Sequence, residues 1–133
     1  MSRTARRAAT LLSALTLAVV AFAAPAQAAP AVVTPTVLGD CPSSYACLWT
    51  LTDFQGTRWQ GQNRNNTLPS SIDNNSWSSY NHGVNCTVHF WTGQNGTGVA
   101  FNEGIGSRRA DLRQNGRPDG GTWADVISSV TWC

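Results

Sequence analysis

The feature that most constrains the fold is the stretch CLWTLTDFQGTRWQG, at residues 47–61. Its first part suits a β-strand, its centre holds the turn residues Asp and Gly, and the following Thr-Arg-Trp resumes the alternation of a strand. Trp49 and Phe54 stand on either side of the turn, so their rings can stack on each other. Gly56 then supplies a backbone conformation that side chains disfavour. The stretch predicts a β-hairpin closed by its own aromatic clasp.

The same pattern returns later in the chain and indicates an internal duplication. The run WTGQNGTG at residues 91–98 matches the first stretch at an offset of 42 residues, and Gly96 stands at the position of the clasp aromatic. The offset superimposes aromatic residues on one another, so we expect large aromatic side chains to be mostly buried at Trp49, Trp91 and Phe101.

A second shared element follows each copy. It reads NNSWSS at residues 74–79 and ADVISS at residues 124–129, an offset of 50 residues. The second copy therefore carries about eight extra residues, which we place between Gly104 and Gly121. Two copies are too few for a solenoid, and no long helical periodicity is present. The sequence predicts a duplicated all-β domain.

These motifs carry a resemblance to a known family. The spacing aromatic-x4-aromatic-x-Gly, followed by Asn/Asp-Asn/Asp-x-x-Ser/Thr-Ser, resembles the Greek-key motif pair of βγ-crystallin-type domains. The first copy matches fully, and the second departs at Gly96 and Ala124. The opening CPSSYACLW and the terminal TWC look more narrowly like small secreted bacterial peptidase inhibitors of this fold (peptidase inhibitor family thirty-six). The resemblance implies a βγ-crystallin-like domain at 41–133, with two Greek-key motifs at about 41–85 and 86–133.

Residues 1–28 have the composition of a signal peptide. Three arginines precede an apolar run at 8–24, and Ala26-Gln27-Ala28 forms a small-residue cleavage site. The apolar run is short for a spanning helix and no charged stop follows it. We therefore expect a secreted, extracellular protein cut after Ala28, with a flexible, Pro-punctuated lead-in at 29–40.

Removal of this segment changes the charge of the chain. The full sequence has a formal net charge of +2, from nine arginines and seven acidic residues. Three of the arginines lie in residues 1–28, so six remain against seven acids and the net charge becomes −1. Binding to nucleic acid or to an anionic membrane thereby loses its main support. The remaining length of about 105 residues is that of one domain, which we expect to be a monomer.

All four cysteines lie in the predicted domain, at positions 41, 47, 86 and 133. An even count in a short exported chain predicts two disulfides, and three pairings are open. We favour Cys41–Cys47 with Cys86–Cys133, which keeps each bond within one repeat; the inhibitor resemblance implies the same pairing. A zinc site is the alternative, but the sequence lacks C-x2-C and Cys/His ligand spacings.

Calcium is the one cofactor that the sequence suggests, and we expect that the protein requires no cofactor. In the resembled family each calcium site takes oxygens from both motifs, which implies that the ligands here are Asn75, Ser76, Ser78, Asp125 and Ser128. Asp125 is the only carboxylate in the two motif loops, so we expect weak binding. The alternative is that these side chains only cap turns.

The composition argues against an enzyme. His82 and His89 are the only histidines and Glu103 is the only glutamate. No G-x-S-x-G or H-E-x-x-H motif is present, and oxidised cysteines are not nucleophiles. We expect His89 on the solvent face of its strand, with Val88 and Phe90 on the opposite face.

Binding to another protein is the function for which the sequence suggests a physical mechanism. A disulfide-locked β domain can hold an extended segment ready-shaped for a protease cleft, so the ordering cost is met before binding. The inhibitor resemblance places this segment at Cys86, Thr87 and Val88, and implies an aliphatic residue after the cysteine, as suits thermolysin-type metalloproteases. Thr87 is polar instead. The prediction is an inhibitor whose partner is an extracellular protease, most simply a metalloprotease. The alternative is that this segment is only strand and disulfide anchor.

The sequence is also compatible with two other functions. The fold also includes killer-toxin-like antimicrobial proteins, for which the working surface would be the loop 104–121, with its four arginines and the compensating Asp111 and Asp119. The second of these functions is that of a secreted structural domain that binds calcium weakly.

Overall fold

The computed structural model describes residues 38–133. The predicted signal peptide at 1–28, and the lead-in up to residue 37, lie outside the described residues. The described part contains short strands and single 3₁₀ turns, which confirms the all-β prediction. The strands are β1 (Ala46–Leu51), β2 (Gln55–Gly61), β3 (Ser78–Asn81), β4 (Val88–Gly93), β5 (Thr97–Glu103), β6 (Arg108–Arg109) and β7 (Ser129–Trp132). The 3₁₀ turns are η1 (Leu38–Asp40), η2 (Gln94–Gly96) and η3 (Leu112–Gln114).

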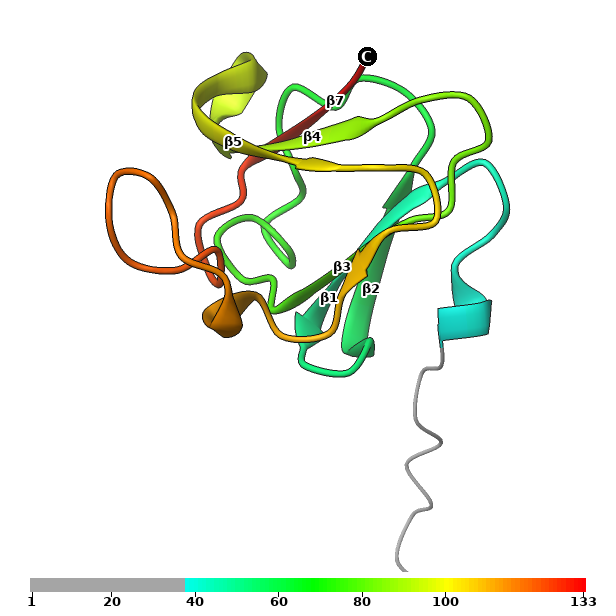
Figure 1. The fold of residues 1–133 in the computed structure, drawn as a ribbon, viewed down its shortest axis with the longest axis horizontal. Coiled ribbons are helices and arrows are strands. Elements are labelled where there is room, and N and C mark those ends of the chain that lie inside the picture. Colours follow the sequence, from blue (N-terminus) through cyan, green and yellow to red (C-terminus); the bar gives the residue numbers. More distant parts are fainter. Residues whose placement is uncertain (1–37) are drawn as a thin grey trace, which may run out of the picture. The chain divides into compact units, whose positions relative to one another are not determined.

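The strands form two antiparallel sheets that exchange segments (Figure 1). One sheet has the order β2-β1-β3-β6 and the other β5-β4-β7. β6 belongs to the second copy but pairs with β3 of the first, and Asn65 of the first copy bridges Val130 in β7. Each copy thus gives its third extended segment to the sheet of the other. This exchange interlocks the two Greek-key motifs.

The inner faces of the two sheets share one hydrophobic core. Leu48 of β1, Phe90 of β4 and Val130 of β7 are completely buried within it. Leu68 and Ile72, from the otherwise polar connection between β2 and β3, are buried in the same cluster. Because the apolar positions of both sheets alternate with outward residues, a chain of this length can enclose a continuous core.

The predicted aromatic clasp is present in the first copy. The rings of Trp49 and Phe54 meet edge to face, with centroids 5.4 Å apart. Gly56 has a φ of 80°, and a Cβ at this position would lie 2.4 Å from Thr50 Oγ1, so glycine is required. Phe54 itself has a φ of 62°, an unfavourable value for a bulky residue. The ring contact and the hydrogen bond from the Phe54 N–H to Ser78 Oγ hold the residue in this conformation, and Gly96 of the second copy adopts the same region without a side chain.

Trp49 and Phe101 are buried, and Trp91 is buried to a lesser degree, with its indole Nε1 donating to Thr131 Oγ1. One sequence-based prediction needs correction, the offset of 50 residues. Strand pairing places Ser78 opposite Trp49, and Ser129 opposite Trp91, so the equivalent residues are 51 positions apart.

The one-residue difference arises because the sequence match aligned the two Ser-Ser pairs, whereas backbone register decides which residues are equivalent. Asn74 and Asp125 both have positive φ, 52° and 57°. The Asn74 N–H donates to the Ile127 carbonyl, and the Asp125 N–H donates to the Ser76 carbonyl. These reciprocal bonds define the true correspondence: Asn74 matches Asp125, and Trp77 matches Ser128.

Candidate functional site

The connection between β3 and β4, residues 82–87, is anchored at its start by the first disulfide segment. Cys41 and Cys47 are bonded, with a Cα–Cα distance of 6.0 Å. His82 Nδ1 donates to the Cys41 carbonyl at 2.8 Å, and the His82 N–H donates to the Tyr45 carbonyl at 2.9 Å. The His82 carbonyl accepts from the Ser44 N–H at 2.8 Å. The loop therefore leaves β3 in a fixed direction.

The second disulfide anchors the other end of the loop. Cys86 and Cys133 are bonded, with a Cα–Cα distance of 5.6 Å, which confirms the predicted pairing of all four cysteines. The Thr87 carbonyl accepts from the Cys133 N–H at 3.0 Å. The Cys86 carbonyl accepts from Asn81 Nδ2 at 2.9 Å. One disulfide thus fixes the end of the loop, and hydrogen bonds to the segment of the other disulfide fix its start.

The three residues of the predicted inhibitory segment differ in accessibility. Cys86 and Thr87 are half-buried. Val88 is completely buried, because it is the first residue of β4 and faces the core with Phe90. Its side chain cannot enter a partner's pocket while the fold is intact. The accessible part of the segment therefore ends at Thr87.

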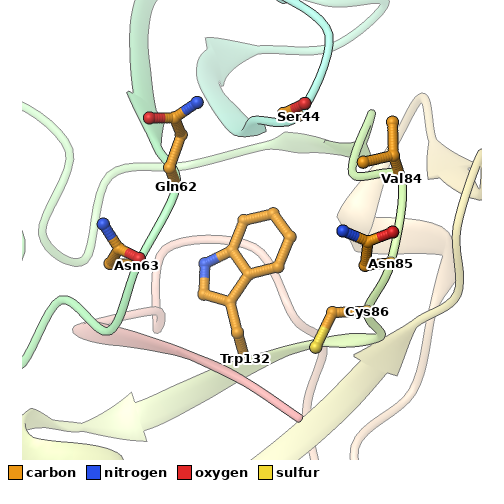
Figure 2. A pocket seen from close by; sticks show the side chains of 7 residues that line it. All are labelled: Ser44, Gln62, Asn63, Val84, Asn85, Cys86 and Trp132. Atoms are coloured by element: carbon orange, nitrogen blue, oxygen red, sulfur yellow. The ribbon is translucent and has the colours of Figure 1, made fainter.

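A groove of about 420 Å³ opens beside this loop (Figure 2). The indole of Trp132 projects into its centre, with amide side chains on one side and the loop on the other. None of the lining side chains is ionisable, so the groove combines an aromatic ring with neutral donors and acceptors, as protein-binding and ligand-binding clefts commonly do. The lining residues are Ser44, Gln62, Asn63, Val84, Asn85, Cys86 and Trp132.

Val84 is the functional candidate that the sequence analysis missed. It lies at the loop tip, and 57% of its surface is exposed. A signal was present, since Val84 is an apolar residue in the polar run NHGVNC. Its exposure is visible only in the folded structure, where the disulfide of Cys86 and hydrogen bonds at the start of the loop hold both ends.

The predicted calcium ligands are only partly brought together. Asp125 Oδ1 accepts from Trp77 Nε1 at 2.6 Å, and Ser128 Oγ donates to the amide oxygen of Asn74 at 3.3 Å. The Ser76 carbonyl accepts from the Asp125 N–H. The buried Ser76 hydroxyl has no hydrogen-bond partner among the described residues.

The side chains of the other two predicted calcium ligands, Ser78 and Asn75, make hydrogen bonds to other parts of the chain. Ser78 Oγ donates to the Leu51 carbonyl at 2.7 Å and accepts from the Phe54 N–H at 3.2 Å, so it fastens the hairpin. Asn75 Nδ2 donates to the Ser71 carbonyl at 3.2 Å. Within residues 38–133, no group of three or more His, Cys, Asp or Glu side chains is placed to hold a metal ion.

The arginine-containing loop 104–121 contains β6 and η3, and most of its charges are paired. Arg113 contacts Asp111 at 2.8 Å and Arg117 contacts Asp119 at 2.8 Å. The Arg113 hydrogen bond lowers the pKa of Asp111 to about 2, and the Arg117 hydrogen bond lowers the pKa of Asp119. Arg109 lies over the Phe101 ring, 4.7 Å from its centroid. The charged side chains of this loop thus form internal ion pairs and a cation–π contact, while Leu112 of the same loop is completely buried in the core.

The titratable residues of the described part form no nucleophile–base arrangement among themselves. His89, half-buried on β4, pairs through Nδ1 with Asn102 Oδ1 at 2.6 Å. Glu103 is completely buried, and its carboxylate accepts from the Ser79 and Ser107 hydroxyls. No helix within residues 38–133 is long and apolar enough to cross a membrane.

The interlocked Greek-key pair defines a βγ-crystallin-type domain, and comparison with solved structures agrees. A structure from work on the evolution of the eye lens βγ-crystallin domain fold is 19% identical, with a TM-score of 0.59, covering 70% of this chain and 89% of that chain. A βγ-crystallin from an archaeon is 15% identical, with a TM-score of 0.55, covering 69% of this chain and all of that chain. At these identities the likeness shows the fold alone.

The family is shown by a separate comparison. The model of peptidase inhibitor family I36 matches residues 35–103, which include β1 to β5 and the loop at 82–87. The chain belongs to peptidase inhibitor family I36. This membership indicates that the protein is not an enzyme and that its partner is a protease. Together with the two disulfides it is consistent with an extracellular location. No curated protein matches the chain.

Proposed function

We propose that the protein is exported and inhibits an extracellular metalloprotease by placing the loop 83–87 in the protease cleft. The observation that carries the proposal is the double anchoring of this loop. Its start is bonded to the Cys41–Cys47 segment and its end to Cys133, while the Val84 side chain between them is 57% exposed. A loop ordered before binding loses little further conformational entropy in the complex.

The same anchoring explains why a protease would cleave and release such a loop only slowly. If the protease cut a peptide bond between residues 83 and 87, both new ends would stay attached, one to β3 and the other to Cys133 through Cys86. The tethered ends would remain near each other at high effective concentration, so release of products would be slow and rejoining favoured.

Thr87 and Val84 are the side chains that this geometry offers to an apolar pocket. Replacing Thr87 with Val or Ile should strengthen inhibition of a thermolysin-type enzyme, because an added apolar contact contributes about 1–3 kcal/mol. Replacing Thr87 with Asp should weaken inhibition by at least as much, since it places an unpaired charge in that pocket. Thr122→Val, the same change on an exposed residue of the distant 115–122 loop, serves as the control.

The test is an inhibition constant for each variant against a panel of metalloproteases and serine proteases, with both disulfides verified intact. The chain is expressed with its own residues 1–28 in an exporting host. We expect at least one metalloprotease to be inhibited in the order Thr87→Val, wild type, Thr87→Asp. If no variant inhibits any protease of the panel, the proposal fails, and a growth-inhibition assay becomes the next experiment. The paired charges of the arginine loop give the toxin-like function no independent support.

A further inference from the structure

A second loop leaves the domain beside the first. Val88 at the start of β4 pairs with Glu103 at the end of β5, so the chain entering β4 and the chain leaving β5 are neighbours. The entering chain is the loop 83–87, and the leaving chain is the loop 104–107. Each carries a large apolar side chain at its tip: Val84 is 57% exposed and Ile105 is 55% exposed.

One buried side chain joins the two loops. Asn81 at the end of β3 is completely buried. Its Nδ2 donates to the Cys86 carbonyl at 2.9 Å and to the Glu103 carbonyl at 2.8 Å, and its Oδ1 accepts from the Gly83 N–H at 2.8 Å. Both amide hydrogens and the amide oxygen are therefore used.

The main chain of Asn81 completes the connection. Its N–H donates to the Ser107 carbonyl at 3.0 Å, and its carbonyl accepts from the Gly106 N–H at 2.8 Å. The Ser107 hydroxyl also donates to the buried Glu103 carboxylate at 2.5 Å. A buried network in which every member is satisfied holds its parts in one arrangement. The tips of the two loops are thus fixed relative to each other.

From this arrangement we infer that the loops 83–87 and 104–107 form a single docking edge, and that Ile105 is a second contact to the same protease. The inference rests on the proposed function of the first loop. A stable protease–inhibitor interface buries about 800 Å² on each partner and takes about 20–30 residues a side, more than one five-residue loop supplies. The adjacent loop, with an exposed apolar tip held by the same asparagine, supplies part of the remainder.

The primary test compares two exposed apolar residues. Ile105→Ser removes the proposed second contact, and Leu51→Ser makes a matched change at a residue that is 50% exposed in the β1–β2 hairpin. Both sites are on the surface, so both variants should fold, which circular dichroism checks. We expect Ile105→Ser to raise the inhibition constant about tenfold and Leu51→Ser to change it less than about twofold.

The outcomes separate this inference from the function on which it rests. If the wild-type protein inhibits a protease and Ile105→Ser behaves like Leu51→Ser, the docking edge is wrong while the proposed function stands. If the wild-type protein inhibits nothing, both are overturned.

A second pair of variants tests Asn81 as a positioning residue. A Cβ on Gly83 would lie 2.6 Å from Asn81 Oδ1 and 2.7 Å from the Trp132 ring, whereas a Cβ on Gly116, outside the proposed docking edge, would meet nothing within 4 Å. Gly83→Ala should therefore loosen the loop and make the folded protein a faster-cleaved substrate, by about tenfold in cleavage rate. Gly116→Ala should behave as wild type. Equal cleavage rates for Gly83→Ala and wild type would overturn the role of Asn81.

Discussion

Trp77 and Ser128 occupy equivalent positions in the two copies, yet they differ in what they offer a cation. The Trp77 indole can only donate, and it donates to Asp125 Oδ1. The Ser128 hydroxyl can both donate and accept, and it faces the neutral amide of Asn74. The one carboxylate among the predicted calcium ligands therefore already has an indole partner. This pairing adds a second reason for weak calcium binding to the shortage of acids.

We propose that calcium binds weakly at most, and calorimetry tests this. The expected dissociation constant is well above the micromolar range that sensor sites reach. The reason is that Asp125 supplies the only carboxylate among the predicted ligands and already accepts a hydrogen bond from Trp77 Nε1. Trp77→Ser should increase the affinity, and Asp125→Ala should reduce it more than Asn75→Ala does. Submicromolar binding by the wild-type protein would contradict the argument.

The Asp111–Arg113 pair makes a prediction about pH. The hydrogen bond from Arg113 lowers the pKa of Asp111 from 3.8 to about 2. A lowered pKa in the folded state means that the pair's stabilising contribution is present above pH 3.8 and is lost as the pH falls through about 2. An NMR titration should give a value near 2 for Asp111, and Arg113→Gln should raise it toward the ordinary value. An unchanged pKa in that variant would show that Arg113 is not the cause.

At the scale of elements, the β1–β2 hairpin depends on one glycine. Gly56→Ala should lower the free energy of unfolding by about 1–3 kcal/mol, since the position combines a φ of 80° with a close approach to Thr50 Oγ1. Gly116→Ala is the control, because a Cβ there meets nothing within 4 Å and its φ is not positive. Urea unfolding of the two variants measures the difference. Equal stabilities would contradict the account of the hairpin.

The elements also show what the sequence could predict. The hairpin and its clasp could be recognised because Trp49, Phe54 and Gly56 act within a few residues of one another. The burial of Val88 also followed from strand alternation, although the family resemblance included it in the inhibitory segment. The true offset of 51 residues and the exchange of β6 could not be predicted, since both depend on pairing between distant strands.

The candidate site was predictable only in part for the same reason. The disulfide pairing was favoured among three by the repeat boundaries and by the family resemblance, and the bond of Cys86 helps to locate the loop between β3 and β4. The placement of the loops that carry Val84 and Ile105 depends on the bonds that Asn81 makes to five other residues, a role for which the sequence carries no local signal.

For the whole molecule, we propose export with cleavage after Ala28. The motive is the arginine-led apolar segment followed by Ala-Gln-Ala, in a chain whose described domain has both pairs of cysteines oxidised. Mass spectrometry of the protein recovered from the medium of an exporting host should show an N-terminus at Ala29. Retention of residues 1–28 on the cell-associated protein would contradict this proposal.

The central claim is that the protein binds its protease through the doubly anchored loop, and amide hydrogen exchange tests it most directly. The exchange of the protein alone is compared with that of its complex with the most strongly inhibited protease of the panel. The account predicts new protection at residues 83–87 and 104–107, and unchanged exchange at the β1–β2 turn and in the loop 115–122. Protection at either of those control sites without protection at 83–87, or failure to form a complex with any protease, would contradict it.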